Sequence, residues 1–158
     1  MDNMKKANDD FEILAERLRE GFDNLPFNRT LGLTVKTIAP ARAQMMFAKS
    51  PNLIGNYIQD VLHGGVISSV LDATGGLTAG TIIIERVLAQ KQTPAPKSLL
   101  RMGTIDLRVD YLRPGQGETF IATGSIMRAG RKVAVTRMEL HNDQNLLIAV
   151  GTGTYLVG

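Results

Sequence analysis

The sequence contains no cysteine, no tryptophan and only two histidines among its 158 residues. The absence of cysteine excludes disulfides, thiolate metal ligands and a cysteine nucleophile. With His63 and His141 as the only imidazoles, a three-histidine metal centre is excluded as well. These absences rule out several common classes of metal and thiol chemistry.

Charge is neither abundant nor strongly one-sided. Charged residues make up 21% of the chain, hydrophobic residues 44%, and the net charge is +3, which is the balance of an ordinary soluble globule. A duplex phosphate backbone requires a dense basic stripe, so this scattered charge favours an anionic small molecule over nucleic acid. At about 100–200 residues per domain, the length predicts one domain over residues 1–158.

Long apolar segments are also missing. The N-terminal stretch MDNMKKANDD has two lysines but no apolar region behind them, so it does not match a secretory signal. The most apolar stretch, Leu77 to Ile84, is far shorter than the ~20 residues needed to span a bilayer. We therefore expect a cytoplasmic protein without a membrane partner.

Hydrophobic periodicity predicts helix and then strand in the first third of the chain. Apolar residues recur in steps of three and four across residues 9–24, which predicts a helix that Pro26 ends. This helix would form an N-terminal extension, residues 1–29, that packs on a sheet. Two strand-like runs separated by a turn follow between residues 31 and 48.

Residues 62–86 show the apolar spacing of a helix but an unusual composition. The stretch contains Gly64, Gly65, Gly75, Gly76 and Gly80. Each glycine in a helix interior is about 1 kcal/mol less favourable than alanine. Such residues are accounted for if a sheet backbone wraps closely around this helix. A polar, proline-marked loop is expected next, at residues 88–99.

From residue 104 onward the hydrophobic period changes from 3.6 to 2. The alternation predicts four strands separated by turns at residues 114–117, 128–131 and 142–145. We expect successive strands to pair as a four-stranded meander, which gives an antiparallel α+β fold around one central helix.

Three motifs in this order resemble one family over about residues 30–157. The central helix opens with HGG at residues 63–65, and Asp72 follows after six further residues. The stretch TIDLRVDYLRPG at residues 104–115 is similar to the family's third strand, and RAGRKVA at 128–134 to its basic hairpin turn. Together they resemble the hot-dog fold of PaaI-type acyl-CoA thioesterases, an antiparallel sheet wrapped around a long central helix.

This resemblance implies a thioester hydrolase without metal or organic cofactor that converts acyl-CoA to free acid and CoA. Asp72 would activate a water or attack the thioester to form a mixed anhydride, and both routes stay open. The Gly64 amide at the helix N-terminus would stabilise the oxyanion, and Gly65 would let the substrate approach. The resemblance also implies a homodimer or homotetramer, in which Asp72 of one chain works with Gly64 of another.

Each site residue also has a structural alternative. Gly64 and Gly65 could simply permit close packing, and Asp72 could be a structural carboxylate, although a buried carboxylate is costly unless it is paired or used. His63 could steady the thioester or cap the helix locally. Thr104 matches a hydroxyl that orients water in relatives, or is an ordinary strand threonine.

The substrate-binding residues are less sharply defined. Relatives carry an asparagine about six residues before HGG that polarises the thioester carbonyl, but Tyr57 stands there in this chain. Asn56 is our choice for that role, and Asn52 is the alternative. Basic residues at predicted turns could contact the CoA phosphates or be solvated turn charges. They are Arg113, Arg128, Arg131 and Lys132.

Acyl selectivity is expected to come from the helix at residues 11–22 and the loop at 88–99. The apolar residues Leu53, Ile54 and Tyr57 favour a medium- or long-chain fatty acyl group over a small polar one. Two other functions stay open: a non-catalytic acyl-CoA binding or sensor module, and a hot-dog dehydratase or hydratase.

Overall fold

A computed structural model describes residues 2–89 and 102–158. The helices are α1 (Asp2–Asp23), α2 (Pro26–Leu31) and α3 (Gly64–Ala89), with a short 3-10 helix η1 (Pro51–Leu53). The strands are β1 (Thr34–Ala39), β2 (Arg42–Ala48), β3 (Ile54–Asn56), β4 (Val61–Leu62), β5 (Gly103–Tyr111), β6 (Thr119–Ala129), β7 (Val133–Asn142) and β8 (Leu147–Leu156). The loop expected at residues 88–99 lies outside the described residues from residue 90 onward.

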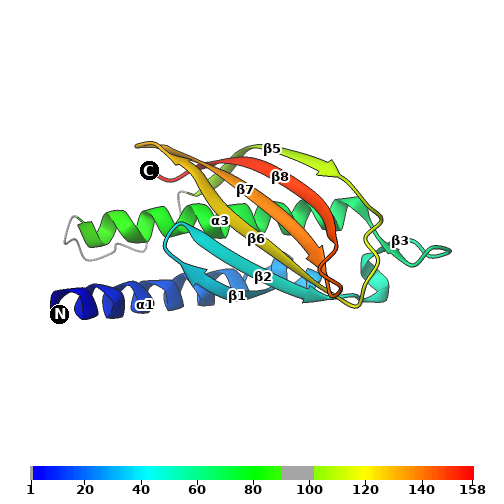
Figure 1. The fold of residues 1–158 in the computed structure, drawn as a ribbon, viewed down its shortest axis with the longest axis horizontal. Helices are drawn as coiled ribbons and strands as arrows, with labels where there is room; N and C mark the ends of the chain where they lie inside the picture. The colour runs from blue at the N-terminus through cyan, green and yellow to red at the C-terminus, as the bar shows by residue number, and fades with distance from the viewer. Residues whose placement is uncertain (1, 90–101) are drawn as a thin grey trace.

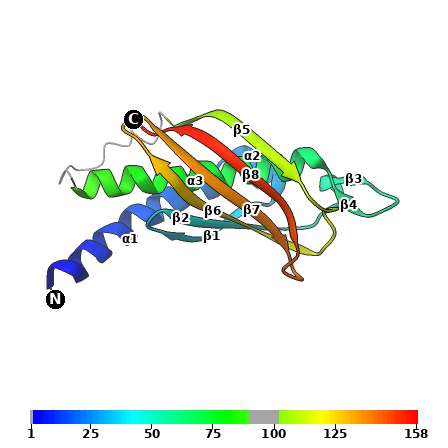
Figure 2. The same cartoon turned by 45° about the horizontal axis from the view of Figure 1, so that its top comes forward.

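The sheet and the two long helices form a layered arrangement around α3. Six antiparallel strands, in the order β1-β2-β6-β7-β8-β5, curve across one side of α3 (Figure 1). Helix α1 packs against both α3 and β1 and runs alongside α3 (Figures 1 and 2). This confirms the prediction of an α+β fold with a central helix and an N-terminal helix.

Several glycines allow the close approach that the sequence predicted between α3 and its neighbours. A Cβ at Gly75 would overlap the ring and hydroxyl of Tyr155 on β8. On β6, a Cβ at Gly124 would overlap the hydroxyl of Thr78. At Gly80, a Cβ would lie 3.0 Å from Leu18 of α1. The glycine content of α3 therefore reflects contact with the sheet and with α1.

Burial also accounts for the apolar character of α3. At 26 residues, α3 is long and apolar enough to cross a membrane by length and composition alone, contrary to the sequence expectation. Most of it is enclosed, since 78% of its most apolar window is buried in the protein. That is the environment of the core helix of a globular domain, where residues such as Val70, Leu71 and Leu77 are fully buried.

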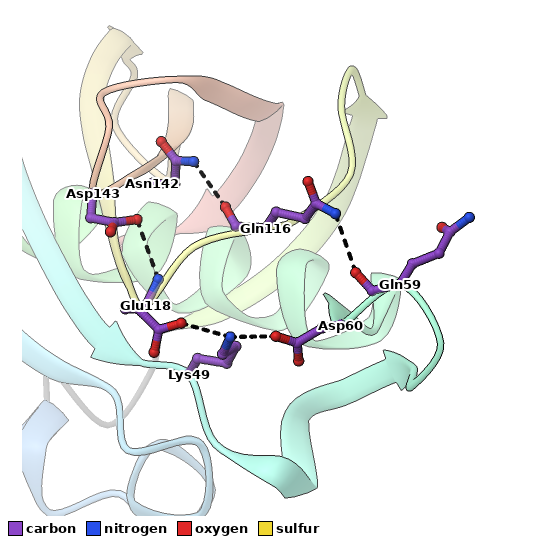
Figure 3. Close-up of polar contacts among 7 residues, drawn as sticks. All are labelled: Lys49, Gln59, Asp60, Gln116, Glu118, Asn142 and Asp143. Atoms are coloured by element: carbon purple, nitrogen blue, oxygen red, sulfur yellow. Dashed lines mark hydrogen bonds and ion pairs between the residues drawn. The ribbon is translucent and has the colours of Figure 1, made fainter.

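The predicted four-stranded meander is wrong in one respect. Strands β6, β7 and β8 pair in succession, but β5 pairs with β8 at the sheet edge and β6 pairs with β2. The connection after β5 crosses the end of the sheet instead of making a hairpin. The Gly115 carbonyl accepts the Leu62 N–H at 3.0 Å. Asn142 Nδ2 donates to the Gln116 carbonyl at 2.8 Å, as Figure 3 shows. These contacts hold the crossing segment, and no alternation pattern could have revealed them.

Candidate active site

Asp72 lies in the third turn of α3, where side chains from two strands hold one of its carboxylate oxygens. Thr104 on β5 donates its hydroxyl to Oδ1 at 2.9 Å. Tyr155 on β8 donates to the same Oδ1 at 3.2 Å, and its hydroxyl also lies 3.1 Å from the Asp72 carbonyl. No donor in the described ranges contacts Oδ2. The two oxygens of the carboxylate are therefore distinct: Oδ1 is anchored and Oδ2 is available.

Tyr155 is the site residue that sequence reasoning missed. It is 2% exposed, and a Cβ at either Gly75 or Gly153 would overlap its ring. Burial and the neighbouring Asp72 carboxylate both raise the pKa of Tyr155, so its hydroxyl remains a proton donor. The two residues are separated by 83 positions in the chain, and Tyr155 alone in an alternating strand gives no signal of this contact.

Asp72 opens into a cleft of about 450 Å³, a size common for small-ligand sites. Helix α1 lines one side of this Asp72 cleft with Arg17, Leu18, Gly21 and Phe22, together with Leu25 just before α2. The other walls include Ala73 and Gly76 on α3 and Met102 and Gly103 at the start of β5. The cleft is thus mostly apolar, with the carboxylate and two hydroxyls gathered on one part of its wall.

The N-terminus of α3 presents a different set of groups. His63 Nδ1 accepts the Gly65 N–H at 2.9 Å, which is the local helix cap that the sequence left open. The Gly64 carbonyl accepts the Tyr111 hydroxyl at 3.0 Å. Within the described part of the chain, nothing accepts the Gly64 N–H. This amide is therefore a free donor at the positive end of the helix dipole.

Asn56 and Asn52 lie just before this helix end. Asn56 is in the β3–β4 hairpin, and its Oδ1 accepts the N–H groups of Ile58 and Gln59 at 3.0 and 3.2 Å. This turn holds the side-chain oxygen and leaves Nδ2 as a donor. Asn52 is exposed in η1. The strands of this hairpin, only three and two residues long, gave no periodic signal in the sequence.

A polar network joins the β3–β4 hairpin to the sheet (Figure 3). Lys49, at the end of β2, contacts Asp60 of the hairpin turn at 2.6 Å and Glu118 before β6 at 2.8 Å. Gln116 Nε2 donates to the Gln59 carbonyl at 3.2 Å. The hydrogen bonds that Lys49 donates to Asp60 and Glu118 raise the pKa of Lys49 to about 12. Asp60 also adopts a left-handed φ of 51°, which aspartate tolerates better than most residues.

The predicted phosphate-binding residues do not come together within one chain. Arg113 lies near the N-terminal end of α3 and donates to the Leu147 carbonyl at 2.9 Å. The β6–β7 hairpin, with Arg128 near the end of β6 and Arg131 and Lys132 in the turn, lies at the other end, where Arg86 of α3 donates to the Arg131 carbonyl at 3.0 Å. The span of α3 between these ends is about 33 Å. The sequence identified the turns but could not show at which end of the sheet each one falls.

No group of three or more histidine, aspartate or glutamate side chains gathers in a metal-binding arrangement within residues 9–89 and 102–158. The functional groups of the candidate site are one anchored carboxylate, two hydroxyls and a free backbone amide. A family model described as the thioesterase superfamily matches residues 59–149, more than half of the chain.

The chain belongs to the thioesterase superfamily.

Among curated relatives, this thioesterase is 50% identical over 135 residues to the medium/long-chain acyl-CoA thioesterase YigI of Escherichia coli K12, covering 85% of this chain and 87% of that protein. A crystal structure from Shewanella oneidensis, described as related to the thioesterase superfamily, has a TM-score of 0.86 and 45% identity. It covers 94% of this chain and 97% of its own. The Escherichia coli PaaI protein shares the fold, with a TM-score of 0.72, 20% identity and coverage of 91% and 93% of the two chains.

Proposed function

We propose that this thioesterase hydrolyses medium- and long-chain acyl-CoA to free fatty acid and CoA in the cytoplasm. The observation that carries the proposal is the anchored Asp72 carboxylate on the wall of an otherwise mostly apolar cleft. A thioester whose carbonyl is at Asp72 would place its acyl chain against apolar side chains. The 50% identity to a medium/long-chain acyl-CoA thioesterase supports the same substrate class.

Asp72 acts through Oδ2, because Oδ1 is held by Thr104 and Tyr155. On one route, Oδ2 removes a proton from a water that attacks the thioester carbon, and CoA leaves as the thiolate. On the other route, Oδ2 itself attacks, CoA leaves, and water then hydrolyses the mixed anhydride. Both routes require a carboxylate with fixed orientation, which is what the two hydroxyls supply.

The Gly64 amide stabilises the oxyanion, and it does so for a thioester that Asp72 of a second chain attacks. Gly64 and Asp72 are eight residues apart on one helix, which separates them by about 12 Å. A reacting carbonyl must lie about 3 Å from both its nucleophile and its oxyanion donors. One chain therefore cannot complete the site, and a homodimer can.

Strand β5 suggests how two chains meet. It is a sheet-edge strand, and it contacts the Asp72 carboxylate through Thr104 near one end and the Gly64 carbonyl through Tyr111 at the other. Antiparallel pairing of two β5 strands across a two-fold axis would bring the Thr104 end of one against the Tyr111 end of its partner. Asp72 of one chain would then face Gly64 of the other.

Residues around the helix N-terminus complete the substrate site in this proposal. Asn56 Nδ2 is a donor for the thioester carbonyl, with Asn52 as the alternative, and Gly65 lets the substrate approach. His63 holds this end of α3 in place through its cap. The basic turn residues contact the CoA phosphates, and their separation in one chain means that different chains of the oligomer supply them.

The test is release of free thiol from acyl-CoAs of C2 to C16, benzoyl-CoA and phenylacetyl-CoA, with the native chain and Asp72→Asn. We expect turnover that peaks at medium or long chains, and a loss of about 10²–10⁴-fold in kcat for Asp72→Asn. Asp10→Asn, at an exposed position of α1 outside the lining of the cleft, is the matched control and should retain native activity. Full activity of Asp72→Asn, or acyl-CoA binding without turnover by the native chain, would contradict the proposal.

A further inference from the structure

The Asp72 cleft has one wall that belongs entirely to the N-terminal extension. This wall consists of Leu18, Gly21 and Phe22 of α1 and of Leu25 just before α2, and α3 lines the cleft with Ala73 and Gly76. Apart from Asp72, Arg17 is the only charged residue that the described parts of the chain contribute to the lining. A site of this composition suits an unbranched hydrocarbon that is attached to a reacting carbonyl at the carboxylate.

Gly21 differs from the glycines of α3 because no contact within the described residues explains it. A Cβ built there meets no described atom within 4 Å, whereas a Cβ at Gly76 on the opposite wall would already lie 3.8 Å from both Phe22 and Tyr155. Gly21 lies within α1 and does not have a positive φ. Glycine weakens a helix interior, and here neither backbone conformation nor a close neighbour requires it. What a glycine at position 21 does provide is open space at the wall of the Asp72 cleft.

We propose that the Asp72 cleft holds the acyl chain between α1 and α3, and that Gly21 sets the longest chain it accepts. This inference rests on the proposed acyl-CoA hydrolysis. A side chain at position 21 would occupy the space that the distal methylenes of a long chain need. Phe22 bounds the same space, so shortening it would admit longer chains.

The test measures binding and turnover separately. Binding uses alkyl-CoA thioethers of C4 to C16, which cannot be hydrolysed, and turnover uses the matching acyl-CoAs. For Gly21→Leu we expect a shift of the preferred length to shorter chains, with Kd and kcat/KM for longer ones worsening about fourfold for each methylene displaced. Phe22→Ala should shift the preference the other way. The matched control is Glu20→Leu, which adds the same side chain one position away, outside the cleft lining.

Folding of the Gly21 variant is checked by its melting temperature, which should not fall because leucine is the better helix former. An unchanged length profile in both Gly21→Leu and Phe22→Ala would overturn the inference, as would an equal shift in Glu20→Leu. If instead the proposed hydrolysis is wrong, the native chain turns over no acyl-CoA. The thioether affinities then still decide whether Gly21 limits the chain length.

Discussion

The middle of α3 and its N-terminal end are built in contrasting ways. In the middle, Asp72 is held by hydroxyls from β5 and β8, and one of these, from Tyr155, is 2% exposed. At the N-terminal end, the β3–β4 hairpin projects from the body of the protein (Figures 1 and 2), and its residues Tyr57 and Ile58 are 88% and 80% exposed.

The difference supports the proposal that each region is one half of a shared site. The middle of α3 presents a fixed carboxylate, and the end presents a free amide at Gly64 beside a hairpin that the described chain leaves largely uncovered. The two regions are about 12 Å apart on the same helix, so in the proposed function they serve different thioesters. If two chains share an active site, each chain must supply one carboxylate region and one amide region.

After the loss of Asp72 itself, the largest effect is expected from removing the amide at the exposed end. Gly64→Pro deletes the N–H, and proline is well tolerated at the first helical position, so α3 should still begin there. Loss of one oxyanion donor typically lowers kcat by about 10²–10³-fold. Steady-state kinetics on the best acyl-CoA, with circular dichroism to confirm folding, measures it.

The matched control is Gly64→Ala, which keeps the N–H. Its Cβ would lie 3.5 Å from the Tyr111 ring, an ordinary contact, so kcat should stay close to native. If Gly64→Pro folds and turns over at the native rate, the Gly64 amide is not the oxyanion donor.

A smaller effect is expected in the enclosed region from Tyr155→Phe, which removes one of the two hydroxyls on Asp72 Oδ1. Loss of one hydrogen bond to a charged group, about 1.4 kcal/mol, corresponds to about tenfold in kcat. Because the Tyr155 side chain is 2% exposed and its hydroxyl is engaged with Asp72, KM should change little. An equal rise in KM with unchanged kcat would show that Tyr155 acts on binding instead.

The smallest effect is expected from Lys49→Met, which frees the β3–β4 hairpin from the sheet. The pKa of Lys49 is raised to about 12, so its contribution is fully present below 10.5 and is lost as the pH rises through about 12. At neutral pH the variant should show faster hydrogen exchange over residues 54–62 and a few-fold loss in kcat/KM. Unchanged exchange in the hairpin would exclude the anchoring role.

The two regions also differ in how far the sequence predicts them. Hydrophobic periodicity predicted α3 and the long strands, and the glycines of α3 predicted its close contacts. The HGG motif and Asp72 came from a family resemblance, which the match to the thioesterase superfamily confirms at the level of the family. Tyr155 and the edge position of β5 were not predictable, because both depend on contacts between residues far apart in the chain.

The most direct test of the shared site mixes two inactive variants. Asp72→Asn and Gly64→Pro chains are unfolded together and refolded, or exchanged as subunits, and thiol release is measured. In a mixed dimer one site combines the intact Asp72 with the intact Gly64, so random pairing should restore about one quarter of native activity. Activity that stays at the level of the separate variants, although mixed dimers form, would contradict a site shared between two chains.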